Sequence, residues 1–333
     1  MIMKQPALTL KALGWDEHFD GQLRESSDVP VRITKINRNA LWVISPTGVE
    51  RLRLFDRGTG HNYAVGDWIV PSADEGHPPR ILVRKTIIRR RAAGAVNSAQ
   101  LIAANIDTLF IVSSCNADFN VARIERYVAL AFAEEVSPVL LLTKADTVED
   151  AFSYLSRVKE ALAYVPAFTI NAKSQKTVAI LGPWCGTGHT VALAGSSGVG
   201  KSTLTNLLTG REEDTAEIRE NDASGRHTTT ARSMFEMTAG GWLIDTPGMR
   251  SLRLYNGRHG VDAVFPDVAD LASACRFNDC NHLHEPGCAL RAAVSAGKLD
   301  ATRLARWQKL VEEDDHSDES ALARAIRKRP EVR

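Results

Sequence analysis

The sequence has no long hydrophobic run. No apolar stretch in its 333 residues approaches the roughly 20 residues that a membrane-spanning helix needs. The N-terminal residues also lack the pattern of a secretory signal. These two absences lead us to expect a cytoplasmic protein that does not associate with a membrane.

Cysteine is scarce and acidic or basic excess is almost absent. The five cysteines are too few and too irregularly spaced for a disulfide framework. The net charge of +1 does not by itself demand a nucleic-acid partner. With 44% hydrophobic and 24% charged residues the composition is that of a globular protein. A chain of this length can form two or three domains, and we find no internal repeats.

The N-terminal third, after a leader over residues 1–29, carries short strand-like runs separated by turn residues. The runs begin at Val31, Ala40, Val49, Asp67 and Arg80. About five short strands in sixty residues are typical of a small β-barrel, and we predict one over residues 30–92. An OB-fold is the first choice, although an SH3-like barrel would give nearly the same pattern.

The pattern changes over residues 93–256, where long apolar strands alternate with amphipathic helices. We predict strands at 106–114, 138–146 and 167–173, helices at 121–135 and 151–164, and a strand and helix within 191–208. This alternation predicts an α/β domain with a mostly parallel sheet, whose ligands bind at the carboxyl ends of the strands. Residues 257–333 read as a helical, polar module, with helices at 290–296 and 301–313 and a basic tail.

Residues 195–202, GSSGVGKS, match the P-loop pattern G-x-x-x-x-G-K-[ST] at every fixed position. Glycines allow the backbone to fold into a nest of N–H groups around phosphates, and the following helix adds its positive end. Lys201 would reach the β- and γ-phosphates, and Ser202 would ligate Mg²⁺. A chance match is expected roughly once in a hundred chains of this length. The predicted phosphate-binding residues are Gly195, Ser196, Ser197, Gly198, Val199, Gly200, Lys201, Ser202 and Thr203.

A second motif, D-x-x-G from Asp245 to Gly248, follows an apolar strand. A carboxylate at such a strand end is where a contact with Mg²⁺ is expected. The motif alone is weak and would more often be a turn, but behind a P-loop it supports nucleotide binding by Asp245 and Gly248.

Two further segments are candidates for reading the base. In Thr143-Lys144-Ala145-Asp146, the carboxylate of Asp146 would accept two hydrogen bonds from guanine, and adenine offers no such pair of donors. Thr143 stands where Asn is usual, and its hydroxyl would support the loop but contact the base less fully. The tripeptide Asn171-Ala172-Lys173 would close over the base, and Ser is more common than Asn at its first position.

The order of these motifs is unusual, because the base-reading segments precede the P-loop whereas a Ras-like GTPase has them after it. The same sheet then requires a circular permutation. With the barrel before it and a cysteine cluster after it, the chain resembles the ribosome small subunit-dependent GTPase A family over roughly residues 30–290. The resemblance implies a GTP hydrolase of late small-subunit maturation, a monomer stimulated by the ribosome, that binds GTP, GDP and rRNA.

Residues 225–230 resemble the first switch of that family. Thr228 or Thr229, with Thr229 preferred, would complete the Mg²⁺ shell. Met249 follows D-x-x-G where a Ras-like enzyme has the Gln that orients water, so we expect slow intrinsic turnover. We hypothesise that His227 is catalytic, together with Lys201, and positions the attacking water. The alternative is a solvated loop with a structural histidine.

Three cysteines and a histidine, Cys275, Cys280, His282 and Cys288, lie within fourteen positions. This set suits one closed, structural, tetrahedral Zn²⁺ site. Buried free cysteines, or a disulfide with one cysteine left over, are the alternatives, and His284 is a competing ligand. Because the segment has little apolar material, we expect the metal to supply much of its folding energy. The second switch leads directly into this module, so we expect nucleotide state to move it.

Basic residues gather in two runs. The first is taken as the last barrel strand and carries Arg80, Arg84, Lys85, Arg89, Arg90 and Arg91, and the second is the tail with Arg324, Arg327, Lys328 and Arg329. Such runs are usually solvated faces, but small basic barrels also track nucleic-acid backbones. Three other classes remain open. They are a signalling or transport GTPase whose barrel binds protein rather than RNA, a zinc-dependent RNA-binding module with an idle nucleotide site, and an ATPase, which Asp146 disfavours.

Overall fold

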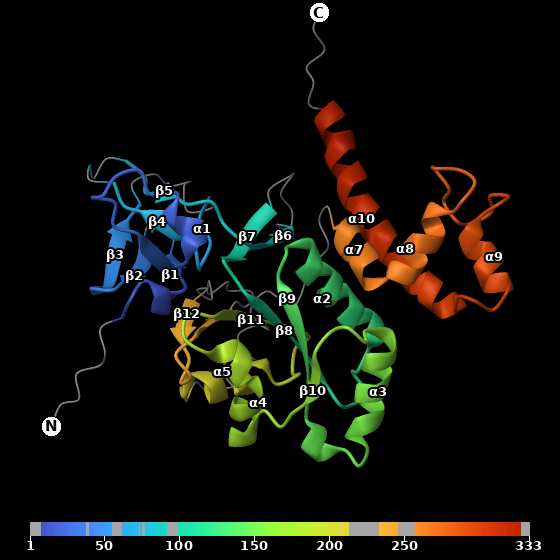
Figure 1. The fold of residues 1–333 in the computed structure, drawn as a ribbon, viewed down its shortest axis with the longest axis horizontal. Helices are drawn as coiled ribbons and strands as arrows, with labels where there is room; N and C mark the ends of the chain where they lie inside the picture. Colours follow the sequence, from blue (N-terminus) through green and yellow to red (C-terminus); the bar gives the residue numbers. More distant parts are fainter. Residues whose placement is uncertain are drawn as a thin grey trace, which may run out of the picture. The chain divides into compact units, whose positions relative to one another are not determined.

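The computed structural model describes residues 8–37, 40–54, 62–72, 74, 77–91, 99–212, 233–245 and 257–327 (Figure 1). The chain forms two compact units, which are treated separately below. The first unit comprises residues 1–90, 99–119 and 136–251, and the second comprises residues 91–98, 120–135 and 252–333.

The barrel segment of the first unit is a small set of antiparallel strands. After the short helices η1 (Lys11–Leu13) and α1 (Glu17–Asp20) come β1 (Val31–Asn37), β2 (Ala40–Ser45), β3 (Gly48–Arg53), β4 (Trp68–Val70) and β5 (Arg80–Ile81). They lie in the order β3-β2-β1-β4-β5, with β1 paired to both β2 and β4. Their inward side chains, among them Ile33, Leu41, Val43 and Ile69, form one apolar core. The arrangement agrees with the predicted small barrel.

The run from Arg80 to Arg91 is not the single strand expected from the sequence. It contains β5 and, after a break, β6 (Ile87–Arg91), which pairs with β7 (Ala99–Ala104) instead of the barrel. The break falls where Leu82 is buried and where the guanidinium of Arg84 turns to the buried carboxylate of Asp67. Tertiary contacts therefore divide a segment whose composition favours one continuous strand.

A mostly parallel sheet forms the rest of the first unit. It contains β8 (Thr108–Ser114), β9 (Ser137–Thr143), β10 (Ala167–Thr169), β11 (Thr190–Ala194), β12 (Ser233–Glu236) and β13 (Trp242–Asp245). Their order is β10-β9-β8-β11-β13-β12, and only β12 runs antiparallel to its neighbour β13. Lys35 of β1 pairs with Ser233 of β12, so the barrel strands and this sheet form one continuous eleven-stranded sheet.

Helices α3 (Ala151–Ala161), α4 (Gln175–Cys185) and α5 (Lys201–Thr209) accompany the sheet. Leu181 of α4 and Leu204 of α5 pack with Phe110, Leu141 and Leu193 of the central strands in one buried core. Helix α4 was not predicted from the sequence, because Gly182 and Pro183 within it disfavour a helix. Burial of its apolar side chains stabilises it despite that composition.

The second unit is helical. It contains α2 (Val121–Ala133), α7 (Arg258–Val264), α8 (Pro266–Ser273), α9 (Ala289–Ser295) and α10 (Ala301–Arg327). Helix α2 follows β8 in the chain but packs against α7, where a Cβ added to Gly260 would lie 2.1 Å from the carbonyl oxygen of Ala129. The buried carboxylate of Glu125 on α2 is paired with Arg306 of α10 at 2.9 Å. No helix in the described ranges is long and apolar enough to cross a membrane.

Candidate active site and metal centre

Each predicted nucleotide motif follows a parallel strand at the same edge of the sheet. The pairing of Ser114 with Thr143 places the ends of β8 and β9 side by side. The P-loop follows β11, the Asn171 segment follows β10, and Asp245 is the last residue of β13. Because parallel strands present their carboxyl ends together, the sheet gathers motifs that are far apart in the sequence. This is the edge at which ligand binding was expected.

The P-loop backbone depends on its glycines. Gly195 has a φ of 141°, and a Cβ there would lie 2.2 Å from the carbonyl oxygen of Val112. Gly198 and Gly200 also have positive φ angles, of 74° and 96°, which side-chain-bearing residues rarely adopt. Between them Val199 is buried in the sheet core and anchors the loop. Helix α5 begins immediately after, at Lys201.

The ammonium group of Lys201 lies inside this loop. Its Nζ donates to the carbonyl oxygen of Gly195 at 2.8 Å and also to that of Ser196. Ser202 and Thr203 lie partly buried in the first turn of α5. A cation, backbone N–H groups and a helix N-terminus therefore converge at one point, which is the chemistry that binds phosphate groups.

Thr143 connects the predicted base-reading loop with the P-loop. The side chain is buried, and its Oγ1 lies 2.6 Å from the carbonyl oxygen of Val199 and 3.2 Å from that of Ser113. The next residue, Lys144, has a φ of 57°, and its carbonyl oxygen accepts a hydrogen bond from the Thr147 hydroxyl. The hydroxyl was predicted to support the loop and to contact the base less fully than Asn would, and its hydrogen bonds to the two backbone carbonyls agree with that supporting role.

The other base-reading candidates are the carboxylate of Asp146 and the loop that contains Asn171. Asp146 is exposed within η3 (Ala145–Thr147). The Asn171 side chain accepts a hydrogen bond from the N–H of Lys173 at 2.8 Å, so it shapes its own loop. Ala172, between them, is buried, and its neighbour Lys173 is exposed.

Most residues of the two predicted switches lie outside the residues that the structure describes. Asp245 is partly buried at the end of β13, opposite Ser233 of β12. The predicted first switch, with His227, Thr228 and Thr229, lies outside the described residues, as do Gly248 and Met249. The basic tail residues Lys328 and Arg329 also lie outside them.

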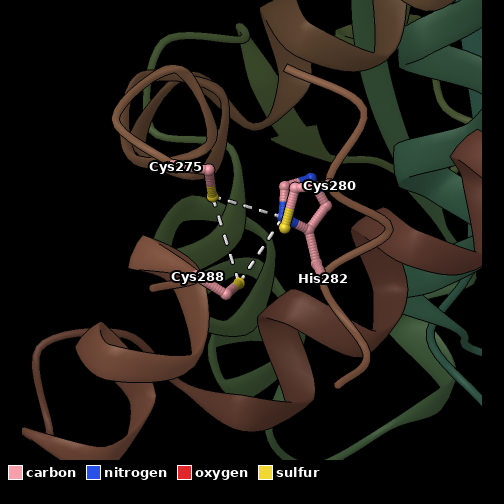
Figure 2. A group of neighbouring side chains, drawn as sticks. All are labelled: Cys275, Cys280, His282 and Cys288. Carbon is pink, nitrogen blue, oxygen red and sulfur yellow. Dashed lines mark hydrogen bonds between the residues drawn. The ribbon is translucent and has the colours of Figure 1, made fainter. Parts of the chain in front are cut away.

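The second unit brings Cys275, Cys280, His282 and Cys288 together, with their ligand atoms all within 4.8 Å of one another (Figure 2). His282 Nδ1 lies 3.5 Å from the sulfur of Cys275 and 3.6 Å from that of Cys288, and the two sulfurs are 4.0 Å apart. Tetrahedral zinc, with metal–sulfur distances of about 2.3 Å, requires ligand atoms roughly 3.5–3.8 Å apart. The donor set therefore fits a metal ion, and His284 is not part of it.

The surroundings of the cluster shift the pKa values of its ligands. Burial lowers the pKa of His282 and favours the neutral imidazole that a metal needs. Burial raises the pKa of the Cys275 thiol, but hydrogen bonds from the N–H groups of Ala289 and Leu290 outweigh it and hold that pKa below its usual value. Burial and the neighbouring thiols raise the pKa of Cys280 to about 11. A group of thiols with one favoured thiolate is suited to receive a cation.

Glu285 is a functional residue that the sequence analysis missed. Its carboxylate accepts hydrogen bonds from the N–H groups of Asn281, Leu283 and His284, the backbone on both sides of His282. Hydrogen bonds from its own N–H and from these three lower the pKa of Glu285 to about 2. It fixes a loop in which His282 has the unusual φ of 61°. Nothing in the sequence pattern distinguishes it from an ordinary surface glutamate.

Three cations of the basic run between Arg80 and Arg91 form ion pairs within the first unit. Arg80 pairs with Asp28 at 2.7 Å, Arg84 pairs with the buried Asp67 at 2.6 Å, and Lys85 pairs with Asp16. The ion pairs of Arg80 and Lys85 attach the N-terminal leader to the barrel. These three cations are therefore structural, and the run as a whole is not an open basic face.

Comparison with known proteins agrees with this geometry. The family model described as RsgA GTPase matches residues 81–255. The chain is 49% identical to the "Small ribosomal subunit biogenesis GTPase RsgA" of Mesorhizobium japonicum, over 93% of this chain and 91% of that protein. It is 43% identical to the "Small ribosomal subunit biogenesis GTPase RsgA 2" of Vibrio parahaemolyticus, over 91% of this chain and 85% of that protein.

Two solved structures share the fold. One is YjeQ from Thermotoga maritima, with a TM-score of 0.59 and 24% identity over 86% of this chain and 98% of that one. The other is YloQ, described as a circularly permuted GTPase, with a TM-score of 0.59 and 23% identity over 89% of this chain and 98% of that one. The permutation deduced from the motif order is thus confirmed at the level of the fold. The chain belongs to the RsgA GTPase family and is a GTP hydrolase.

Proposed function

We propose that this GTPase binds the small ribosomal subunit and acts late in its maturation, hydrolysing GTP to GDP and phosphate when the subunit stimulates it. The observation that carries the proposal is the permuted sheet, whose single edge gathers a P-loop and a base-reading loop. The 49% identity over nearly the whole chain to a small-subunit biogenesis GTPase supports the same assignment. The protein would act as a monomer in the cytoplasm.

The nucleotide site supports specific roles for its residues. Lys201 would move from the carbonyl oxygens of the P-loop to the β- and γ-phosphate oxygens and stabilise their charge. Asp146 is exposed and would accept the N1–H and amine protons of guanine. Asn171 shapes the loop that closes over the base. Because Met249 cannot orient water, His227 would hold the attacking water once the subunit orders the switch.

Two metals belong to the proposal. Ser202, in the first turn of α5, and Thr229 would hold Mg²⁺, which neutralises phosphate charge when bound; Asp245, on the strand next to β11, lies where it would support that ion. Cys275, Cys280, His282 and Cys288 would hold one structural Zn²⁺. All four zinc positions are filled by protein atoms, so this ion would have no open position for chemistry. The metal would fix residues 275–288, the segment that links α8 to α9.

The domain limits are part of the proposal. We assign residues 30–92 to the barrel, 93–256 to the permuted GTPase and 257–333 to the zinc module with its basic tail. What the barrel binds distinguishes this proposal from its alternative, because here the partner of the barrel is rRNA. In the alternative the protein is a signalling GTPase whose barrel binds protein and no RNA.

The decisive experiment measures GTP hydrolysis by the full chain with and without purified small subunits. We expect small subunits to raise turnover strongly, with large subunits and ATP as the two negative controls. Lys201→Ala should abolish the stimulated rate. Turnover that small subunits leave unchanged would favour the signalling alternative, and a Lys201→Ala protein that keeps full function would show that the nucleotide site is idle.

A further inference from the structure

The outer face of the barrel strands β1, β2 and β3 carries a cross-strand row of two cations around a tryptophan. The strand register pairs Lys35 of β1 with Trp42 of β2, and Trp42 with Arg51 of β3. Arg53 lies two residues further along β3, on the same face. Side chains directly opposite one another on neighbouring strands are close enough to act together.

A β-bulge creates this row. The register of β1 against β2 shifts between Ile33 and Lys35, so Thr34 is the extra residue and Lys35 takes the position opposite Trp42. Without the bulge, Lys35 would point into the barrel core by simple alternation. Ile33 and Ile36 both pack in the barrel core although they are three positions apart. Strict alternation would place them on opposite faces, so this pattern also indicates the bulge.

The side chains of this row are accessible to solvent, and within the described residues its cations form no ion pair. Trp42 retains 36% of its surface accessible, although a large aromatic side chain on a small barrel gains from burial. Arg51 and Arg53 are exposed, and Lys35 is partly so. Within the described residues none of these three cations has an acidic partner. Glu50, the only acidic residue of β3, falls on the opposite face by alternation.

This face contrasts with the run of cations at Arg80, Arg84 and Lys85, each of which is paired with an aspartate. Charge that is neutralised inside the protein cannot bind phosphate, whereas unpaired cations beside an exposed aromatic ring can. Aromatic rings stack on unpaired bases, cations bind the flanking phosphates, and OB-type barrels use the same strands for oligonucleotides.

We propose that the outer face of β1–β3 is an RNA-docking platform, on which an unpaired base stacks on Trp42 while Lys35, Arg51 and Arg53 bind the adjoining phosphates. The proposal rests on the proposed function, and it names the surface through which the barrel reaches rRNA. RNA is favoured over a protein partner because, among the residues that the structure describes, this face carries three cations and no acid around the ring of Trp42.

The test uses the full chain and measures its affinity for small subunits, and for protein-free small-subunit rRNA, across a range of salt. Trp42→Leu should weaken both affinities by about tenfold, since one stacked base is lost, and Trp42→Phe should restore most of the binding. Lys35→Glu and Arg51→Glu should each weaken binding and lower the slope of log affinity against log salt by about one. GTP hydrolysis without subunits should stay unchanged in all four variants.

Matched controls come from α3, where Phe152 is 74% exposed and Lys159 is an exposed lysine. Phe152→Leu and Lys159→Glu make the same chemical changes on another face and should bind as the wild type does. If Trp42→Leu and Arg51→Glu bind subunits normally, the platform is wrong while the proposed function stands. If these variants lose subunits but keep their rRNA affinity, the face binds a ribosomal protein and the RNA assignment is overturned. If the wild type itself fails to bind subunits, the proposed function fails first.

Discussion

The nucleotide edge and the cysteine cluster are stabilised in opposite ways. Around the nucleotide edge, the strands carry side chains such as Phe110, Leu141 and Leu243 with no exposed surface, and the loops follow from those strands. Between Cys275 and Cys288 the chain has no helix or strand, and Cys288 is the one buried residue of that stretch. The fold therefore determines the first site, whereas in the second site the ligands must determine the local fold.

This difference follows from the apolar area available to each region. Burial of apolar surface contributes about 25 cal/mol per Å², and the five-stranded parallel sheet has a large supply of it. In the cysteine segment Phe277 and Leu283 remain 41% and 59% exposed. A segment that buries so little must obtain its order from hydrogen bonds such as those of Glu285 and, in our proposal, from a bound metal. Substitutions should thus separate chemistry from folding in the first region and not in the second.

The largest expected effect is on chemistry alone. Lys201→Ala should lower subunit-stimulated GTP hydrolysis by at least about 100-fold, because it removes the cation that stabilises phosphate charge. The melting temperature should stay within about 2 °C of the wild type, since the hydrogen bonds of Lys201 to the carbonyl oxygens of Gly195 and Ser196 lie within one loop. Hydrolysis and thermal unfolding are measured on the same preparation, with Lys159→Ala as the control. A large drop in melting temperature would contradict a site that is imposed by the sheet.

The second prediction concerns folding of the metal segment. Chelation, or Cys280→Ser, should release one zinc ion per chain and raise amide hydrogen exchange over residues 275–288 and α9. Exchange in β9 and β11 should not change. Cys115→Ala removes a buried thiol of the first unit and should keep the metal. An equal rise of hydrogen exchange in β9 and β11 would show that the stability of the parallel sheet also depends on the metal. The contrast between the two regions would then be wrong.

The third prediction tests whether the backbone around His282 is positioned by Glu285. Glu285→Gln keeps the size of the side chain but replaces one acceptor oxygen by a donor, so the three N–H groups lose part of their partner. We expect zinc affinity to fall by about tenfold, the usual range for residues that orient ligands. Competition with a chromophoric chelator measures it, and Glu160→Gln, at an exposed position of α3, is the control. Unchanged affinity would mean that the four ligands alone order the loop.

Features that depend on residues close together in the sequence could be predicted, whereas features that depend on distant residues could not. The P-loop and the strand before it were predictable, because Gly195, Gly200 and Lys201 have local backbone and charge requirements that a fixed spacing expresses. The ligand set of the cluster was predictable for the same reason. The bulge at Thr34, the pairing of β1 with β12 and the division of the run after Arg80 depend on partners distant in the sequence, and no local pattern encodes them.

The hydroxyl of Thr143 is a further contact of this kind, and it gives the smallest predicted effect. The group is buried and lies 2.6 Å from the carbonyl oxygen of Val199, so it joins the end of β9 to the P-loop. Thr143→Val leaves that carbonyl without its donor at nearly constant volume, and Thr143→Ser keeps the donor. One buried hydrogen bond contributes about 1 kcal/mol, so we expect GDP affinity to fall by about fivefold in the valine variant and little in the serine variant.

Equilibrium titration with a fluorescent GDP analogue distinguishes the two variants of Thr143. Because Asp146 is untouched, the preference for guanine over adenine nucleotides should persist while the overall affinity drops. That combination would show that the hydroxyl holds the cradle in place and does not read the base. If the valine variant binds as tightly as the wild type, the glycines with positive φ angles and the buried Val199 hold the loop without this hydrogen bond. The geometry of the nucleotide edge would then depend on the sheet even more than the structure indicates.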